Sequence, residues 1–201
     1  RRSRGVGELQ MSLSLLLLRH GETELGSGLR GSLDDDLTEQ GWQQMWSALP
    51  AQPRWQRIVS SPLRRCAQFA LQLSLRDRLP LKYADGLREL HFGQWEGRHP
   101  RDLMVDQADA LAAFWNDPYG FTPPDGEPMV RFSERVWAAL AQLEREYAEQ
   151  TILLVTHGGV MRLLLAAARG LPPSQLLQVE VEHGALHRLH YAGGAVEELR
   201  S

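Results

Sequence analysis

Cysteine is nearly absent from this sequence, because Cys66 is the only one among 201 residues. A single cysteine excludes an intrachain disulfide and a zinc site built from several thiolates, and it favours a reducing compartment. The most apolar stretch, residues 15–18, is too short to span a bilayer. It runs into Arg19-His20-Gly21 rather than into a small-residue cleavage site, so a signal peptide is not expected. These features predict a cytoplasmic protein.

An excess of charge of one sign is also missing. Lys and Arg number 22 against 25 Asp and Glu, for a net charge of −3. We therefore expect no nucleic-acid partner and no membrane partner, and any anion site must be built locally from a few Arg and His. The sequence contains neither a Gly-x-x-x-x-Gly-Lys motif nor a Gly-x-Gly-x-x-Gly motif after a strand. A nucleotide cofactor is therefore disfavoured.

The composition, with 43% hydrophobic and 23% charged residues, is typical of a globular protein of one domain. Residues 1–10 are rich in Arg and Gly, and we interpret them as a disordered tail or a cloning remnant. Residues 11–201 are expected to form a single domain with an insertion at about 98–127. Insertions of this length often contact substrate or close over it.

Short apolar segments alternate with amphipathic ones along the chain. This alternation predicts an α/β fold, a three-layer α/β/α sandwich with a mostly parallel central sheet. Strands are expected at 13–18, 57–60, 81–84, 151–156, 179–181 and 185–191, with a last one after Gly193-Gly194. Helices are expected at 38–49, from 61 onward, near 102–115, at 130–148, at 160–168 and, briefly, from 172.

Basic side chains follow three of the predicted strands. Arg19 and His20 end the first, Arg64 comes shortly after 57–60, and His157 follows 151–156. The carboxyl ends of parallel strands lie at one edge of a sheet, where open α/β sheets bind ligands. Two Arg and two His at one point suit a compact dianion, most simply a phosphoryl group.

The helix that follows Ser61-Pro62 has an unusual start. Ser61 is the expected N-cap and Pro62 the first helical residue, so Arg64 and Arg65 fall in the first turn. The helix dipole disfavours a cation there by roughly 0.3–1 kcal/mol each. A bound anion at the helix start would remove this conflict, and two solvated arginines are the alternative interpretation.

Four ordered motifs together resemble the histidine phosphatase superfamily, also called the phosphoglycerate-mutase-like family. The motifs are Leu18-Arg19-His20-Gly21-Glu22-Thr23, then Ser61-Pro62-Leu63-Arg64-Arg65-Cys66-Ala67-Gln68, then Arg88-Glu89-Leu90 with Phe92-Gly93-x-Trp95-Glu96-Gly97, and finally Thr156-His157-Gly158-Gly159. Residues 92–104, with 114–117 and 124–127, are most similar to the α-ribazole phosphatases of cobalamin assembly.

The resemblance implies a phosphomonoesterase of the phosphoglycerate-mutase-like fold that needs no cofactor and no metal. His20 would be the nucleophile and would form a phosphohistidine, for which it must be neutral. Arg19, Arg64 and His157 would bind the phosphoryl oxygens. Glu89 would protonate the leaving alkoxide and then activate water. The substrate would be a small phosphate monoester, with α-ribazole 5′-phosphate as the first choice, and the protein a monomer or homodimer.

Two further positions belong to the expected phosphate site. Thr23 would supply a hydroxyl, and Gly158 would also contact the phosphate. Many relatives carry an Asn three residues after this Thr, where Gly26 stands here. Either a neighbouring residue replaces the Asn or phosphate binding is weaker. Glu22 and Glu96 are rival carboxylates for the role of Glu89.

Other interpretations remain open. A phosphoglycerate mutase or a phosphatase of broad specificity would use the same residues, and a non-catalytic module on the same fold would bind a phosphorylated ligand without turnover. The late histidines His183, His187 and His190 could suggest a metal site. They have no thiol partner and no carboxylate at ligand spacing, so no metal site is expected.

Overall fold

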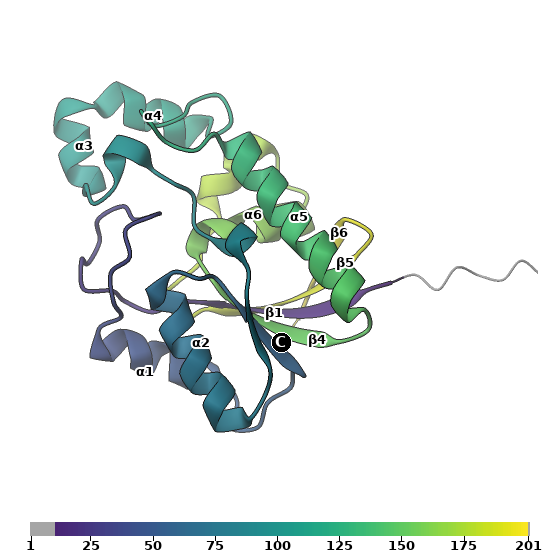
Figure 1. Cartoon of the computed structure of the whole chain (residues 1–201). Helices are drawn as coiled ribbons and strands as arrows, with labels where there is room; N and C mark the ends of the chain where they lie inside the picture. The colour runs from purple at the N-terminus through teal and green to yellow at the C-terminus, as the bar shows by residue number, and fades with distance from the viewer. Residues whose placement is uncertain (1–10, 201) are drawn as a thin grey trace, which may run out of the picture.

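The computed structural model describes residues 11–200, and a six-stranded sheet organises them (Figure 1). The strands lie in the order β3-β2-β4-β1-β5-β6. The first four of these are mutually parallel, and β5 and β6 run antiparallel to their neighbours. The strands are β1 (Leu13–Arg19), β2 (Arg57–Ser60), β3 (Leu81–Tyr83), β4 (Thr151–Thr156), β5 (Leu186–Ala192) and β6 (Ala195–Leu199).

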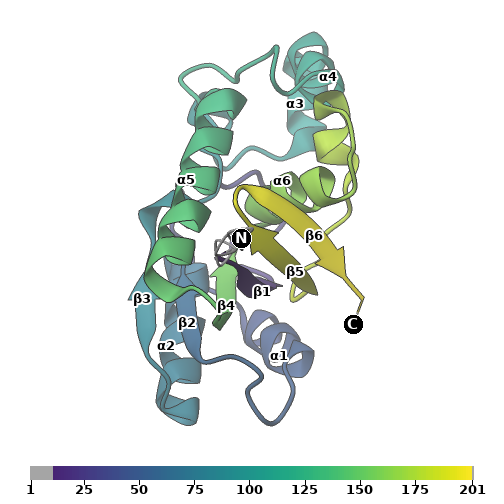
Figure 2. The ribbon, with the colours of Figure 1, turned by 90° about the vertical axis from the view of Figure 1, so that its right-hand side faces the viewer.

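Helices cover both faces of the sheet, which gives three layers (Figures 1 and 2). Helices α1 (Glu39–Ala48) and α2 (Arg64–Asp77) lie on one face, and α5 (Met129–Tyr147) and α6 (Gly158–Ala168) on the other. Helices α3 (Pro100–Asp106) and α4 (Ala108–Asn116) stand beyond the end of the sheet at which β1 finishes. Short 3-10 helices span Asp85–Leu87, Gly93–Trp95 and Pro173–Gln178.

The leucine run of β1 divides between two buried clusters, because successive strand residues point to opposite faces. Leu13, Leu15 and Leu17 pack on the side of α5 and α6. Leu16 and Leu18 pack on the side of α1 and α2. Burying each leucine contributes roughly 1.5–3 kcal/mol, so this strand is fixed in the centre of the molecule. Its carboxyl end is fixed with it.

The predicted α/β/α class is confirmed, with two local corrections. Residues 179–181 do not form a strand, because their backbone serves side chains instead: Val179 O accepts from Arg162 Nε and Val181 O accepts from an Arg19 nitrogen. The helix expected near 102–115 is two helices that meet at Gln107. The Gln107 side chain accepts a hydrogen bond from the indole of buried Trp95 at 3.0 Å, which holds the chain at this break.

The interpretation of residues 1–10 lies outside the described residues. Within residues 11–200, none of the helices combines the length and the apolar character that crossing a membrane requires. The same residues include no cluster of three or more His, Cys, Asp or Glu that could hold a metal ion.

Candidate active site

His20 stands directly after β1, and its backbone N–H donates to Thr156 O at the end of β4. Only 3% of its surface is exposed. Its Nδ1 lies 2.8 Å from Gly21 O. Since a carbonyl oxygen can only accept, Nδ1 carries the proton and Nε2 keeps a free electron pair. Burial lowers the pKa of His20 well below its usual value, and the charges of Arg65 and Arg19 lower it further. His20 is therefore a neutral imidazole with an unprotonated nitrogen.

His157 follows β4 and occupies the N-cap position of α6. Its ring lies edge-on to that of His20, with 5.3 Å between the ring centroids. The Ser61 hydroxyl fixes the ring, with Oγ 2.7 Å from His157 Nε2. The pKa of His157 is also well below its usual value, first because of burial and then because of Arg65. The predicted convergence of two histidines at one edge of the sheet is thus present.

Arg19 enters the same site from the last residue of β1. The pKa of its guanidinium is lowered to about 10 by burial and by the neighbouring charge of Arg162. Gly158 allows the close approach of these groups: a Cβ atom there would lie 3.0 Å from Arg19 Cζ and 2.8 Å from an Arg162 nitrogen. A larger residue at 158 would displace an arginine from the site.

Arg65, and not the predicted Arg64, is the second arginine at the site. Arg65 is fully buried, and its nitrogens donate to Leu33 O at 2.5 Å and to Gly31 O at 2.9 Å. After burial, its charge is the largest influence on the pKa of both His20 and His157. The side chain of Arg64 is 53% exposed and forms an ion pair with Asp36 at 2.8 Å.

The start of α2 differs from the predicted one at the two arginines. The helix begins at Arg64 with Leu63 as its N-cap, two residues later than Ser61 would place it. Successive helical side chains point about 100° apart, so the two arginines face different directions, with Arg65 buried and Arg64 exposed. Nor does the helix start need a bound anion, since the carboxylate of Asp34 accepts from Arg64 N at 2.6 Å. Two aspartates of the chain offset the charge conflict at this terminus.

Glu89 is the acidic residue that reaches the site. One carboxylate oxygen accepts from Gly159 N and the other from Leu90 N, each at 2.9 Å. The rival acids are used elsewhere. Glu96 accepts from the backbone N–H groups of a neighbouring loop, and Glu22 accepts from the Thr38 hydroxyl. Glu22 and Glu96 therefore hold loops together.

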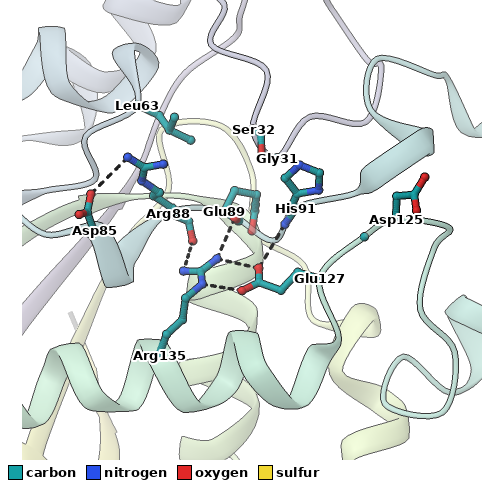
Figure 3. A pocket seen from close by; sticks show the side chains of 11 residues that line it. Gly31, Ser32, Leu63, Asp85, Arg88, Glu89, His91, Asp125, Glu127 and Arg135 are labelled. Carbon is teal, nitrogen blue, oxygen red and sulfur yellow. Dashed lines mark hydrogen bonds and ion pairs between the residues drawn. The ribbon is translucent and has the colours of Figure 1, made fainter.

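Arg135 on α5 holds the segment that carries Glu89 (Figure 3). Its guanidinium donates to the backbone carbonyls of Gly86, Arg88 and Glu89 at 2.8–2.9 Å and pairs with Glu127 at 2.7 Å. Figure 3 shows the bonds of Arg135 to Arg88, Glu89 and Glu127, and Glu89 also lines an open cavity of about 620 Å³ there. His20 does not line that cavity. Arg135 thus fixes the backbone of Glu89 from behind.

A second cavity, of about 310 Å³, is lined by Arg19, His20 and Glu89 but not by Arg65 or His157. Its wall combines basic side chains with six apolar ones, three of which lie on α4. The polar residues of the wall are Arg19, His20, Ser27, Arg30, Glu89, Arg162 and His183. The apolar residues are Leu29, Phe92, Leu111, Phe114, Trp115 and Leu177. We call this space the His20 cavity.

Four of these polar residues, which are Ser27, Arg30, Arg162 and His183, were not predicted from the sequence. Arg30 follows the first motif in an irregular loop and offered no periodic signal. Arg162 lies four residues after Gly158 on α6, so its place on the same helix face was available from the sequence. The sequence suggests His183 only as a metal ligand on a strand, whereas it lies in a turn before β5.

Thr23 and Gly26 differ in their relation to the cavity. Thr23 is 1% exposed and, like Arg65 and His157, does not line the cavity. Gly26 does line the cavity and contributes no side chain to it. Its φ of 67° favours glycine.

Several buried donors at the site have no hydrogen-bond partner in the described protein. They include Arg19 Nε and Arg65 Nε, and the Thr23 hydroxyl is a third such group close by. No carboxylate within residues 11–200 pairs with Arg19 or Arg162. Buried polar groups are normally satisfied, so unpaired donors beside neutral histidines indicate a site for an anion.

Comparison with known proteins agrees with this geometry. The model of the histidine phosphatase superfamily (branch 1) matches residues 15–200. The chain is 37% identical over 177 residues to the adenosylcobalamin/alpha-ribazole phosphatase of Escherichia coli K12, covering 86% of this chain and 87% of that protein. It is 34% identical over 170 residues to the glucosyl-3-phosphoglycerate phosphatase of Mycobacterium tuberculosis H37Rv, covering 79% and 76%.

Solved structures give the same result. The alpha-ribazole phosphatase of Shigella flexneri superposes with a TM-score of 0.78 at 33% identity, covering 92% of this chain and 94% of that one. The mycobacterial glucosyl-3-phosphoglycerate phosphatase also gives 0.78, at 29% identity, covering 89% and 90%. With these matches and the arrangement around His20, the chain belongs to the histidine phosphatase superfamily and is a phosphatase.

Proposed function

We propose that this chain hydrolyses phosphate monoesters through a phosphohistidine on His20, and that α-ribazole 5′-phosphate is its substrate. The observation that carries the chemistry is the state of His20. Its proton is fixed on Nδ1 by Gly21 O, its Nε2 is free, and it lines a cavity with unpaired arginine donors. A neutral imidazole fixed in this way is a ready nucleophile for an anionic phosphoryl group.

In the first step, His20 Nε2 attacks phosphorus and the bond from phosphorus to the ester oxygen breaks. Arg19, Arg65 and His157 donate to the equatorial oxygens and stabilise the charge that is spread over them. Protonated Glu89 gives its proton to the departing alkoxide. The products are the free alcohol and a phosphohistidine.

In the second step, water attacks phosphorus, and Glu89, now ionised, accepts the water proton. The bond between phosphorus and Nε2 breaks, which releases inorganic phosphate and restores His20. The two backbone donors on Glu89, Gly159 N and Leu90 N, hold its carboxylate for both proton transfers. This cycle uses only groups of the chain and needs no cofactor.

The leaving group is proposed to lie against the apolar wall of the His20 cavity. The reacting phosphorus must be next to His20, so the attached alcohol stays in the same cavity. Phe114 and Trp115 on α4 line that wall together with Phe92, and Trp115 is 41% exposed and open to a ligand. Aromatic side chains stack on flat aromatic bases. A ribosyl benzimidazole fits such a wall, which supports α-ribazole 5′-phosphate as the substrate.

Glucosyl-3-phosphoglycerate is the second candidate substrate, because the same cavity has positively charged side chains beyond those assigned to the phosphoryl group. Arg30 and Arg162 line it, and Arg162 has no carboxylate partner in the described chain. A substrate carboxylate could pair with Arg162. This substrate, however, leaves the aromatic side chains of α4 without a partner.

Phosphate release from α-ribazole 5′-phosphate, glucosyl-3-phosphoglycerate and simple monoesters, all measured in EDTA, tests the proposal. We expect kcat/KM to be highest for the ribazole ester and unchanged by EDTA. Preference for the glycerate ester would move the assignment to the second candidate. Transfer of phosphate between glycerate positions with little free phosphate would identify a mutase, and binding without turnover would identify a non-catalytic module.

The remaining proposals concern organisation and location. One sheet supports both buried clusters, which favours a single domain over residues 11–200. The one cysteine, Cys66, is buried, and its pKa is raised to about 12 by desolvation, so it is inert as a thiol. A reducing, cytoplasmic location is consistent with this thiol.

A further inference from the structure

His183 occupies a place in the His20 cavity that the reaction scheme above does not use. Its ring lies 5.9 Å from that of His20 between centroids. Within the described chain, neither of its ring nitrogens forms a hydrogen bond. A half-buried imidazole that lines a cavity without any partner has no evident structural task.

The backbone around His183 is held firmly against the end of β1. Gly184 N donates to Arg19 O at 3.2 Å, and Arg19 N donates to Ala185 O at 3.0 Å. Gly184 has a φ of 73°, and a Cβ atom there would lie 2.8 Å from Gln44 O. The turn therefore has one tight position against α1, and it keeps the imidazole of His183 beside that of His20.

The charges that face His183 are mostly positive. They come from Arg19 on β1, Arg30 on the loop after β1 and Arg162 on α6, with Glu22 as the opposing carboxylate. With burial as the main cause, they lower its pKa to about 4. A neutral imidazole always has one N–H group, so the ring is a donor without an acceptor.

We propose that His183 is a phosphate-binding residue, which donates a hydrogen bond from its ring to an oxygen of the phosphoryl group held beside His20. It supplies a donor in a cavity where Gly26 offers no side chain. This inference rests on the proposed function in one respect, since it requires the His20 cavity to hold a phosphoryl group.

The test is the binding of inorganic phosphate and of sulfate, measured by calorimetry at pH 7.5 without any turnover. Sulfate is included because its charge does not change near neutral pH. The variants are His183→Ala, which removes the donor, and His183→Gln, which keeps an N–H donor on a side chain of similar length. His190→Ala is the matched control, because His190 is a half-buried histidine outside the cavity.

We expect His183→Ala to weaken both anions by roughly ten- to a hundredfold, the effect of one hydrogen bond to a charged group. His183→Gln should recover most of the affinity, and His190→Ala should bind like the parent protein. Unfolding midpoints of all variants are measured in parallel. Equal affinity of the parent and His183→Ala, or equal loss in the Ala and Gln variants at unchanged unfolding midpoints, would overturn the proposal.

This binding experiment, together with the phosphate-release assay above, separates the two proposals. A parent protein that binds phosphate but hydrolyses no ester would end the proposed function, and the role of His183 would still be decided by the binding data. A parent protein that turns over normally, with His183→Ala binding phosphate unchanged, would end the role of His183 alone.

Discussion

Replacing Arg65 and Arg64 separately tests the assignment of the second arginine. Arg65 is buried beside both histidines, and its Nε is an unpaired donor. Removing one charged donor from a developing phosphoryl charge costs about 2.7–4 kcal/mol, which is roughly a hundred- to a thousandfold in kcat. Arg65→Ala should therefore lower kcat/KM by at least this factor. The ion pair of Arg64 with Asp36 is exposed and contributes about 0–1 kcal/mol, so Arg64→Ala should change kcat/KM less than about fivefold.

The assay is hydrolysis of p-nitrophenyl phosphate by each variant, at a temperature where circular dichroism shows it folded. Arg65→Ala also leaves Gly31 O and Leu33 O without their donor, so it should lower stability by about 2–5 kcal/mol. Arg65→Lys keeps the charge and fills most of the space, and it should be folded yet slow, because it lacks the two-pronged guanidinium. A larger loss of activity in Arg64→Ala than in Arg65→Lys would refute the assignment.

Three further outcomes follow from the same geometry. Arg135→Met should change KM by less than about threefold and lower kcat at least tenfold, because the guanidinium positions the backbone of Glu89. Steady-state kinetics that show only a higher KM would contradict this role. Trp115→Ala should raise the KM for α-ribazole 5′-phosphate by roughly tenfold and leave the KM for p-nitrophenyl phosphate nearly unchanged. Equal effects on both KM values would show that the benzimidazole of the substrate binds elsewhere. The pKa values of His20 and His157 are lowered by burial, so below about pH 6.5 the unfolded chain binds more protons than the folded one. The free energy of unfolding should therefore fall as the pH falls, by up to about 1.4 kcal/mol per histidine for each pH unit. Urea unfolding at pH 7.0 and 5.5 measures this dependence. His20→Ala should make the free energy of unfolding less dependent on pH, and an unchanged dependence would argue against a neutral buried His20.

Features with a local or periodic pattern in the sequence could be predicted from it. The apolar runs of β1 and β4, each followed by His-Gly, predicted parallel neighbours that deliver His20 and His157 to one edge. The periodicity of 130–148 located α5 within one residue. The N-cap of α1 was correct as well, because Thr38 Oγ1 accepts from Gly41 N.

Features that depend on a single residue's rotation or on distant contacts were not available from the sequence. The start of α2 at Arg64 is one such feature, because Arg64 N donates to Asp34 in a loop 30 residues away. The break at Gln107 depends on the indole of Trp95. The place of His183 depends on a turn that packs on β1, and no local pattern marks such a contact.

The most direct test of the account is the location of the phosphoryl group during turnover. Glu89→Gln should form the intermediate from p-nitrophenyl phosphate, whose leaving group needs no proton, and should hydrolyse it slowly. We therefore expect rapid quenching with labelled substrate to trap one phosphoryl group per chain, stable in alkali and labile in acid, and peptide mapping to place it on His20. A label on another residue, or product formation with no trapped phosphoryl group and no burst, would contradict the phosphohistidine mechanism.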